Sequence, residues 1–358
     1  MWMEHDLLAQ ELKKTSQAPC VHWDHLENAT VFVTGATGLI GYSLISVLLY
    51  RALETHTNLR VIALVRNVEA ATRRFQEFLD RGCQLEFVSG SMEQLPCIQQ
   101  DVDYIVHCAA PTGSNFFLER PVDTIAAIIN GTQGILELAK EKAVKGMVFL
   151  SSMEVYGQVM EKKKLTEDCL GSIDILSPRS SYPEAKRLAE TLCCSYASQY
   201  QVPVCSARLA QTFGPGVNQD DGRVFAYMAR CAMNDQDITL KTSGSKENMY
   251  LYTMDAVTAI LVLLTQGTPG QSYNVANSNT YCSVKEMGRI VLDALGKPHL
   301  SVKTNVAPED VGAFRPDSYL WLDTGKLEAL GWRAETNLPE MYQKMVALFI
   351  NDGKVEGQ

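Results

Sequence analysis

The chain has 358 residues, 46% of them hydrophobic and 20% charged, and its 32 basic and 41 acidic side chains give a net charge of −9. This composition excludes collagen-like and broadly disordered proteins, and the length suggests two domains or one large α/β domain with a smaller lobe. The acidic balance offers no broad cationic face for nucleic acid or for an anionic membrane, so we expect neither partner.

The ten cysteines and six histidines follow no metal-binding or disulfide pattern in the sequence. Without C-x-x-C or H-E-x-x-H spacing, we predict reduced thiols and no metal site. The N-terminus, with Glu4, Asp6 and Glu11, does not resemble a secretory signal, and no apolar run approaches the roughly 20 residues that span a bilayer. We therefore expect a cytoplasmic protein.

In chain order, residues 1–28 form an amphipathic leading segment with Leu7, Leu8 and Leu12 at helical spacing. From residue 30 onward, apolar strand patterns alternate with helical patterns. The expected strands cover residues 31–33, 60–65, 85–88, 104–108, 147–150 and 202–207. This alternation predicts a doubly wound parallel sheet with helices on both faces. After Arg208 the pattern breaks into shorter pieces, which indicates a second lobe.

The first expected strand runs directly into a glycine turn and then a helical segment. Glycines let the backbone turn sharply and approach a pyrophosphate, which the helix N-terminus attracts. A tight structural turn also favours glycine, but the order of strand, turn and helix favours a dinucleotide cofactor. The expected contacts are Gly35, Thr37, Gly38, Leu39, Ile40 and Gly41. We expect a Rossmann domain over 29–207 and a mainly substrate-binding α/β lobe over 208–358, with about 248–276 returning to the Rossmann domain.

The second expected strand is followed by Arg66, where sites of this type usually carry an acidic residue that binds the ribose hydroxyls. A guanidinium at this position would pair with the 2′-phosphate of NADP, so the sequence favours NADP over NAD. Alternatively, Arg66 stacks on the adenine, and the choice of cofactor stays open.

A second group of polar residues follows the strand expected over 147–150. Ser152 ends this strand, and Tyr182 and Lys186 come later with a spacing that places both on one helical face. Tyrosine is a poor base at neutral pH, but a neighbouring ammonium and a cationic nicotinamide favour the phenolate. We predict that Tyr182 is the acid/base, that Ser152 hydrogen-bonds the same substrate hydroxyl and that Lys186 also holds the nicotinamide ribose.

Together with other motifs, these residues resemble the extended short-chain dehydrogenase/reductase superfamily, in its NAD-dependent epimerase/dehydratase group acting on nucleotide sugars. The resemblance spans nearly the whole chain. The similar segments are 34–41 (TGxxGxxG), 103–110 (DxVxHxAA), 151–157 (SSxxVYG), Tyr182 with Lys186, 208–216 (RxxNxYGPG), 221–224 (DGRV, as in UDP-glucuronate decarboxylases), 315–317 (RxPD) and 330–332 (LGW).

The resemblance implies transient oxidation of a nucleotide-linked sugar, with hydride passing to the nicotinamide and a 4-keto intermediate on the sugar. Glu154 occupies the position at which dehydratases and decarboxylases of the family carry a glutamate, so it is expected to be catalytic. Ser91 replaces an aspartate near the adenine, and Ala109 and Ala110 are expected beside the cofactor.

The resemblance also implies a homodimer, because relatives commonly associate through a helix pair that here includes residues 124–140 and 182–200. Met153 stands where dTDP-glucose 4,6-dehydratases place an aspartate, and a thioether cannot donate a proton, so dehydration is disfavoured. Gln211 replaces an asparagine, and Lys246 is expected to substitute for an arginine that Asn248 replaces. The expected substrate contacts are Thr112, Ser114, Gln211, Arg223, Lys246 and Arg315.

The leading hypothesis is therefore an NAD(P)-dependent enzyme that modifies a nucleotide sugar, with decarboxylation or epimerisation favoured over dehydration. One alternative is an NADPH-dependent reductase of a nucleotide-linked keto-sugar or ketose, suggested by Arg66 and Met153. Another is a non-enzymatic NADP-sensing regulator on the same fold, against which Ser152, Tyr182 and Lys186 argue.

Overall fold

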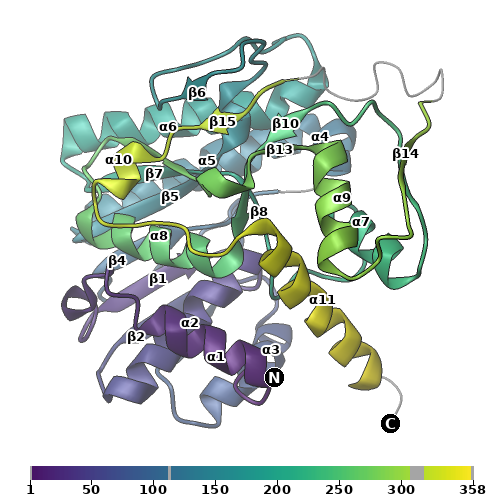
Figure 1. Ribbon diagram of the computed structural model, residues 1–358. Coiled ribbons are helices and arrows are strands. Elements are labelled where there is room, and N and C mark those ends of the chain that lie inside the picture. The colour runs from purple at the N-terminus through teal and green to yellow at the C-terminus, as the bar shows by residue number, and fades with distance from the viewer. Residues whose placement is uncertain (1, 112–113, 307–317, 356–358) are drawn as a thin grey trace.

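The computed structural model describes residues 2–111, 114–306 and 318–355, and a seven-stranded sheet lies at its centre (Figure 1). The strand order is β12-β7-β5-β4-β1-β2-β3, and all neighbouring strands are parallel. The bounds are β12 (Ser272–Val275), β7 (Val204–Leu209), β5 (Gly146–Ser152), β4 (Tyr104–His107), β1 (Thr30–Thr34), β2 (Arg60–Val65) and β3 (Leu85–Ser89). The doubly wound sheet predicted from the alternating apolar segments is confirmed.

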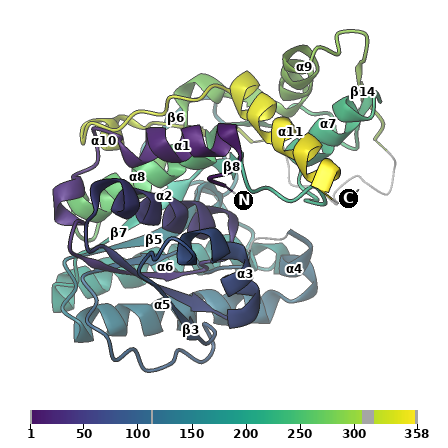
Figure 2. The same ribbon diagram turned by 90° about the horizontal axis from the view of Figure 1, so that it is seen from below.

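Two helical layers cover the sheet. They consist of α2 (Leu39–Thr55), α3 (Val68–Leu79) and α8 (Thr253–Gln266) on one face, and α5 (Pro121–Glu141) and α6 (Ser181–Tyr200) on the other. In β1, Val31 and Val33 pack in the first layer and Phe32 in the second, because successive side chains of a strand point to opposite faces. Figure 2 shows α2 and α8 above the sheet and α5 and α6 below it.

The N-terminal segment forms α1 (Asp6–Ser16), which lies along α2 and α8 on the outer side of their layer (Figure 2). Leu8 and Leu12 are its buried apolar residues. The Glu11 carboxylate accepts a hydrogen bond of 2.8 Å from Lys344 of α11 (Leu338–Val355). The leading segment therefore contacts both the sheet domain and the C-terminal helix.

A smaller lobe stands on the side of the sheet where α4 (Ser114–Glu119) follows β4 (Figure 1). Its strands associate in pairs, β8 with β11, β9 with β14, β10 with β13 and β6 with β15. Their bounds are β6 (Lys164–Leu165), β8 (Gln211–Phe213), β9 (Ile238–Leu240), β10 (Glu247–Asn248), β11 (Tyr250–Tyr252), β13 (Cys282–Ser283), β14 (Val302–Thr304) and β15 (Trp321–Leu322). The helices are α7 (Val224–Met233), α9 (Val284–Ala294) and α11, whereas α10 (Gly325–Glu328) packs beside β12 of the central sheet. Phe213 lies at the core of the smaller lobe. Its ring stacks on that of Phe225, with ring centres 4.6 Å apart, and its ring centre lies 5.0 Å from that of Tyr342.

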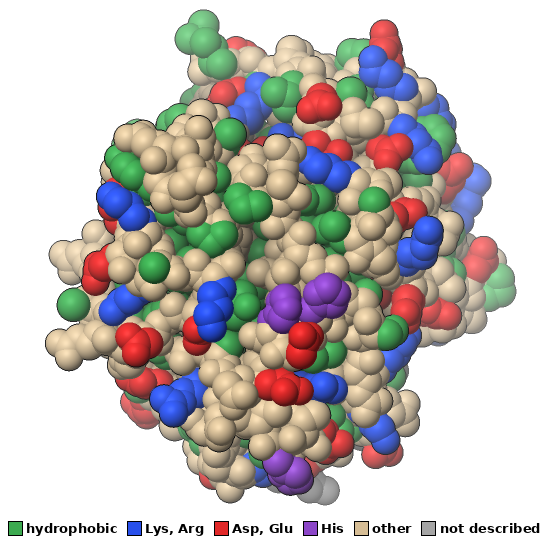
Figure 3. Space-filling view, turned by 90° about the vertical axis from the view of Figure 1, so that its left-hand side faces the viewer, with side chains coloured by type: hydrophobic (Ala, Val, Ile, Leu, Met, Phe, Trp, Pro, Cys, Tyr) green, Lys and Arg blue, Asp and Glu red, His purple; other side chains and the backbone are tan. Residues whose placement is uncertain are grey.

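The chain leaves the smaller lobe after β11 and returns to the sheet domain, where α8 packs and β12 pairs with β7. It then re-enters the lobe at β13. None of the helices within the described residues is long and apolar enough to cross a membrane. The ten cysteines are free. On the face seen in Figure 3, acidic and basic side chains are interspersed.

Candidate active site

At Gly35 and Gly41, the turn between β1 and α2 has no room for a side chain. Gly35 has φ of +65°, and a methyl group on it would lie 2.8 Å from the backbone nitrogen of Ala109. A methyl group on Gly41 would collide with the carbonyl oxygen of Gly35. The first turn of α2 therefore packs directly on bare backbone, and its N–H groups are open to an anion. This cradle fits the pyrophosphate of a dinucleotide.

Ala109 is held beside this turn by a buried hydrogen-bond network. Its N–H donates to Thr34 Oγ1 at 3.1 Å, and Thr34 Oγ1 lies 2.7 Å from His107 Nδ1. Thr132 of α5 lies 3.4 Å from the other ring nitrogen. Burial lowers the pKa of His107 to about 3, so the ring is neutral at physiological pH. His107 therefore shapes the end of β4 and has no role as a base.

A cavity of about 320 Å³ lies next to the end of β2, lined by Arg66, Ser89, Gly90, Ser91 and Gln94. It brings together two residues that the sequence placed at the adenosine end of the cofactor, Arg66 and Ser91. The hydrogen bond from Ser91, with a further contribution from the charge of Arg66, lowers the pKa of the neighbouring Glu93 carboxyl.

Tyr182 and Lys186 lie on the first turns of α6, and both are buried. The Lys186 ammonium donates a hydrogen bond of 2.7 Å to the carbonyl of Leu150 in β5 and lies 5.9 Å from the centre of the Tyr182 ring. Burial lowers the pKa of Lys186 to about 8, and the nearby Glu190 carboxylate opposes the shift. The structure thus places an ammonium next to the tyrosine at the carboxyl end of β5.

Ser152 ends β5, and Glu154 follows in the short 3-10 helix η2 (Met153–Tyr156). The Ser152 hydroxyl accepts a hydrogen bond of 3.2 Å from the Glu154 N–H, so it caps this turn. The turn directs the chain from the sheet edge toward the smaller lobe and places Glu154 beside the N-terminal part of α6.

Arg179 is a further residue of the site that the sequence reasoning missed. Its Nη2 donates to both carboxylate oxygens of Glu154 at 3.0 and 3.1 Å, and its guanidinium lies 5.1 Å from the centre of the Phe117 ring. Phe117 in turn stacks on Tyr182, with ring centres 4.4 Å apart and planes at 14°. Arg179 therefore links Glu154, which is expected to be catalytic, to the candidate acid/base Tyr182 through the ring of Phe117.

The one sequence signal for Arg179 is its position three residues before Tyr182, in the segment that leads into α6. Its two partners come from η2 and α4, which are distant in sequence. Its Nη1 is buried and has no hydrogen-bond partner within the described residues. Buried unsatisfied donors are uncommon in native proteins and are often found at functional sites.

The expected substrate contacts are spread over the lobe. Gln211 begins β8, and Lys246 directly precedes β10. Arg223, at the start of α7, is paired with Asp221, and its Nε lies 3.0 and 3.1 Å from the two carboxylate oxygens. Thr112 and Arg315 lie outside the described residues. Ser114 is the first residue of α4, and its side chain lies outside the described part of the chain.

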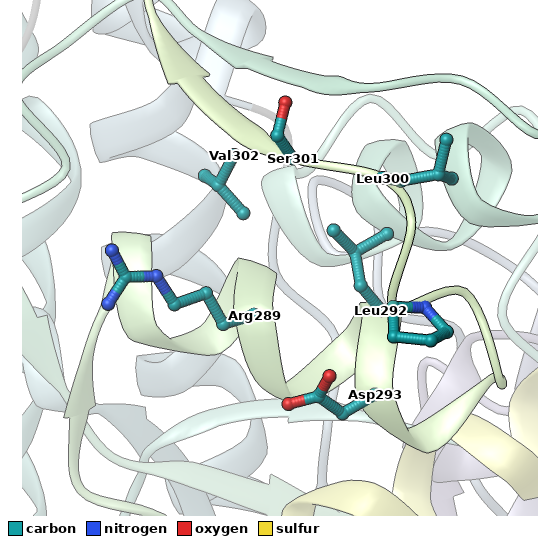
Figure 4. Close-up of a pocket in the computed structure, with 7 residues that line it drawn as sticks. Arg289, Leu292, Asp293, Leu300, Ser301 and Val302 are labelled. Carbon is teal, nitrogen blue, oxygen red and sulfur yellow. The ribbon is translucent and has the colours of Figure 1, made fainter.

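A second hollow, of about 340 Å³, lies on the outer part of the smaller lobe, between α9 and the segment that leads into β14 (Figure 4). Arg289 and Asp293 are its charged lining residues. None of the residues predicted for the cofactor or the substrate lines it, so it is not part of the candidate active site.

Comparison with known proteins agrees with the family resemblance described from the sequence motifs. The model of the NAD dependent epimerase/dehydratase family matches residues 31–276. UDP-glucuronic acid decarboxylase 6 of Arabidopsis thaliana is 28% identical over 314 residues, which cover 87% of this chain and 86% of the relative.

Two solved structures are similar over most of the chain. UDP-N-acetylglucosamine 4-epimerase from Methanobrevibacter ruminantium has a TM-score of 0.77 at 18% identity and covers 91% of this chain and 99% of its own. UDP-glucuronic acid 4-epimerase from Bacillus cereus, in complex with UDP-glucuronic acid and NAD, has a TM-score of 0.72 at 20% identity, with 88% and 97% covered. At these identities the likeness establishes a shared fold.

Proposed function

Because the chain belongs to the NAD dependent epimerase/dehydratase family, we propose that it decarboxylates or epimerises a nucleotide-linked uronic acid through a 4-keto intermediate. UDP-glucuronate is the first substrate to test, because a curated relative that matches most of the chain is a UDP-glucuronic acid decarboxylase. The observation that carries the proposal is the cluster in which Arg179 and Phe117 link Glu154 to Tyr182, with Lys186 on the same helix.

The first step assigned to this cluster is oxidation at C4 of the sugar. Tyr182 removes the proton of the C4 hydroxyl, Ser152 hydrogen-bonds the same oxygen, and the bound nicotinamide supplies the hydride acceptor. With a pKa of about 8, Lys186 is mostly an ammonium at pH 7, so its positive charge favours the phenolate of Tyr182.

The ketone then determines what happens at C5. In a uronate, the C4 ketone makes the carboxyl group part of a β-keto acid, so the bond to the carboxylate breaks, carbon dioxide leaves and the electron pair delocalises onto the ketone oxygen. Glu154, protonated from solvent, then delivers a proton to C5, and Tyr182 returns its proton to the C4 oxygen as hydride returns to C4. If the carboxylate is retained, return of hydride to the opposite face gives the 4-epimer. Neither outcome needs a proton from position 153, where Met153 has none to donate.

The cofactor preference we propose is NADP over NAD. The support is the guanidinium of Arg66 at the cavity of about 320 Å³ beside β2, where Ser91 contributes a hydroxyl. A guanidinium binds a phosphate through two parallel hydrogen bonds and would attract the 2′-phosphate.

The ten free cysteines favour a reducing compartment such as the cytoplasm.

We also propose that the protein is a homodimer that associates through α5 and α6. Both helices form the outer layer on their face of the sheet (Figure 2), and each exposes large apolar side chains there. Val122 is 76% exposed, Ile125 44% and Leu188 50%. Burying these side chains against a second copy would remove apolar surface from water.

The direct test incubates the purified protein with UDP-glucuronate and NAD⁺ or NADP⁺, and follows the sugar by NMR. We expect a UDP-pentose with release of carbon dioxide, or the 4-epimer, without net change in absorbance at 340 nm. Tyr182→Phe is the matched inactive variant. A wild-type protein that leaves UDP-glucuronate unchanged with both cofactors would contradict the proposal.

The second candidate function is an NADPH-dependent reductase of a nucleotide-linked keto-sugar. It is favoured by Arg66, which lines the cavity next to the end of β2. The two functions differ in stoichiometry. A reductase consumes one NADPH for each product molecule, whereas internal oxidation and reduction regenerates the cofactor. Loss of absorbance at 340 nm in proportion to product would support the reductase.

A further inference from the structure

The first residues of the chain are fixed to the cofactor domain by a buried carboxylate. Glu77 of α3 is 2% exposed, and its two carboxylate oxygens accept the backbone N–H groups of Trp2 and Met3 at 2.8 and 2.9 Å. A buried carboxylate is strongly unfavourable unless hydrogen bonds replace its water. The backbone of residues 2 and 3 is therefore an integral part of this layer.

This anchor places the Trp2 indole against the first turn of α2. The indole meets Tyr42 edge to face, with ring centres 5.1 Å apart and planes at 85°. On the Tyr42 ring also lie Phe75, at 4.8 Å, and the Arg74 guanidinium, at 4.4 Å. Tyr42 donates its backbone N–H to the Gly38 carbonyl at 2.9 Å, so the ring that Trp2 contacts belongs to the turn that follows the glycine cradle.

The same indole reaches the smaller lobe. Gly216, with φ of +88°, lies in the loop after β8, and a methyl group on it would be 3.3 Å from Leu39 Cδ1 and 3.6 Å from Trp2 Cζ2. Leu39 is the first residue of α2. Trp2, Leu39 and Gly216 therefore meet at one point, where the helix that faces the pyrophosphate touches a loop of the other lobe.

We propose that Trp2 is a positioning residue for the dinucleotide site. Its indole fills the corner between α2 and the 214–217 loop, and it holds the first turn of α2 in the arrangement that binds the pyrophosphate. The leading segment thus contributes to cofactor affinity although it contains none of the residues expected to touch the cofactor. This inference depends on the dinucleotide site and is independent of the substrate proposed above.

The test measures the dissociation constants of NAD⁺ and NADP⁺ by calorimetry on the cofactor-free full-length protein. If Trp2→Ala leaves about a tenth of the molecules in the binding arrangement, both dissociation constants rise about tenfold. Trp2→Phe retains a ring on Tyr42, so its affinities stay within about threefold of wild type. The rise in melting temperature on adding cofactor becomes smaller in Trp2→Ala than in the wild type.

Leu12→Ala is the matched control, because Leu12 is fully buried in α1, and the end of this helix lies against the C-terminal part of α2, where Arg51 donates a hydrogen bond to the carbonyl of Ser16. It should lower the melting temperature and leave both dissociation constants unchanged. Glu77→Gln weakens the anchor without removing the indole. If Trp2→Ala does not fold, the dissociation constants of this variant are measured instead, and a smaller rise is expected. If the folded Trp2 or Glu77 variants bind both cofactors as tightly as Leu12→Ala does, the proposal is wrong, whatever substrate the enzyme takes.

Discussion

At the scale of single residues, Arg179 stands out because it contacts Glu154 directly and Tyr182 through the ring of Phe117. It holds the carboxylate of Glu154 and packs on Phe117, whose ring stacks on Tyr182. Its side chain is 20% exposed and that of Glu154 22%, so water screens the pair only partly. Loss of the guanidinium should therefore leave Glu154 mobile during the step at C5.

Arg179→Gln should lower kcat for UDP-glucuronate about 100-fold, or about 3 kcal/mol in the barrier, with KM within about threefold of wild type. Combining it with Glu154→Gln should cost little more than Glu154→Gln alone, because the two residues act together. The control is Arg120→Gln, since Arg120 also packs on a ring, Phe116, and pairs with a carboxylate, Asp123, outside the site. Full additivity in steady-state kinetics would show that Arg179 does not act through Glu154.

Arg66 should discriminate between the two cofactors. Arg66→Ala is expected to raise the dissociation constant of NADP⁺ about 10- to 100-fold, since charge-assisted hydrogen bonds contribute about 1.5–3 kcal/mol. The dissociation constant of NAD⁺ should change less than about threefold. Arg73→Ala is the control, because the Arg73 guanidinium is exposed and paired with Glu69. Equal losses for both cofactors would instead mean that Arg66 stacks on the adenine.

At the scale of elements, Asp255 fixes the start of α8 to the chain that precedes α11. Its carboxylate accepts the backbone N–H groups of Glu335 and Thr336 at 3.2 and 3.0 Å. Burial nevertheless raises the pKa of Asp255 to about 6. The folded protein therefore binds a proton here more tightly than the unfolded chain does.

The contribution of Asp255 to stability should accordingly be largest at low pH and decline as the pH rises through about 6. With an unfolded pKa of 3.8, lowering the pH from 7 to 5 should stabilise the wild type by about 1 kcal/mol relative to Asp255→Asn. Urea unfolding of both proteins at pH 5 and pH 7 measures this difference. A stability gap between them that is independent of pH would show that Asp255 is ionised throughout.

Sequence patterns were most informative about individual helices and strands. Continuous apolar runs located β1, β2, β4, β5 and β7, because strands buried on both faces need apolar side chains at nearly every position. The edge strand β3, which is partly exposed and contains Glu86, was also predicted. The spacing of Leu8 and Leu12 predicted the amphipathic segment that forms α1. An amphipathic pattern does not show on which surface of the protein the helix packs. The residues that precede α1 are anchored by Glu77, a buried charge that periodicity would place on an exposed face.

The candidate site was predictable where its residues fall in one local motif. The glycine turn and the pair Tyr182 and Lys186 follow from spacing along single elements. Arg179 does not, because its partners Glu154 and Phe117 come from other segments and meet it only through the packing of α4 and α6.

At the scale of the whole molecule, the two lobes are connected at several points. The chain passes from the sheet domain to the smaller lobe for β6, returns for α6 and β7, passes to the lobe again for β8 to β11, returns for α8 and β12, and leaves again for β13. The ion pair of Glu11 with Lys344 adds a contact between the first and last helices. These connections link the cofactor cradle to the smaller lobe and do not involve the outer face of α5 and α6, where we propose that a second copy binds.

The dimer proposed for that layer makes the last prediction. Ile125→Asp together with Leu188→Asp should convert a particle of two 39.6 kDa chains into a monomer, because two charges would lose water at the contact. Light scattering after size-exclusion chromatography measures the mass. Met160→Asp, which alters an apolar side chain 65% exposed outside both helices, should leave the mass of two chains unchanged. A wild type that is monomeric at micromolar concentration, or a double variant that stays dimeric, would show that α5 and α6 are not the interface.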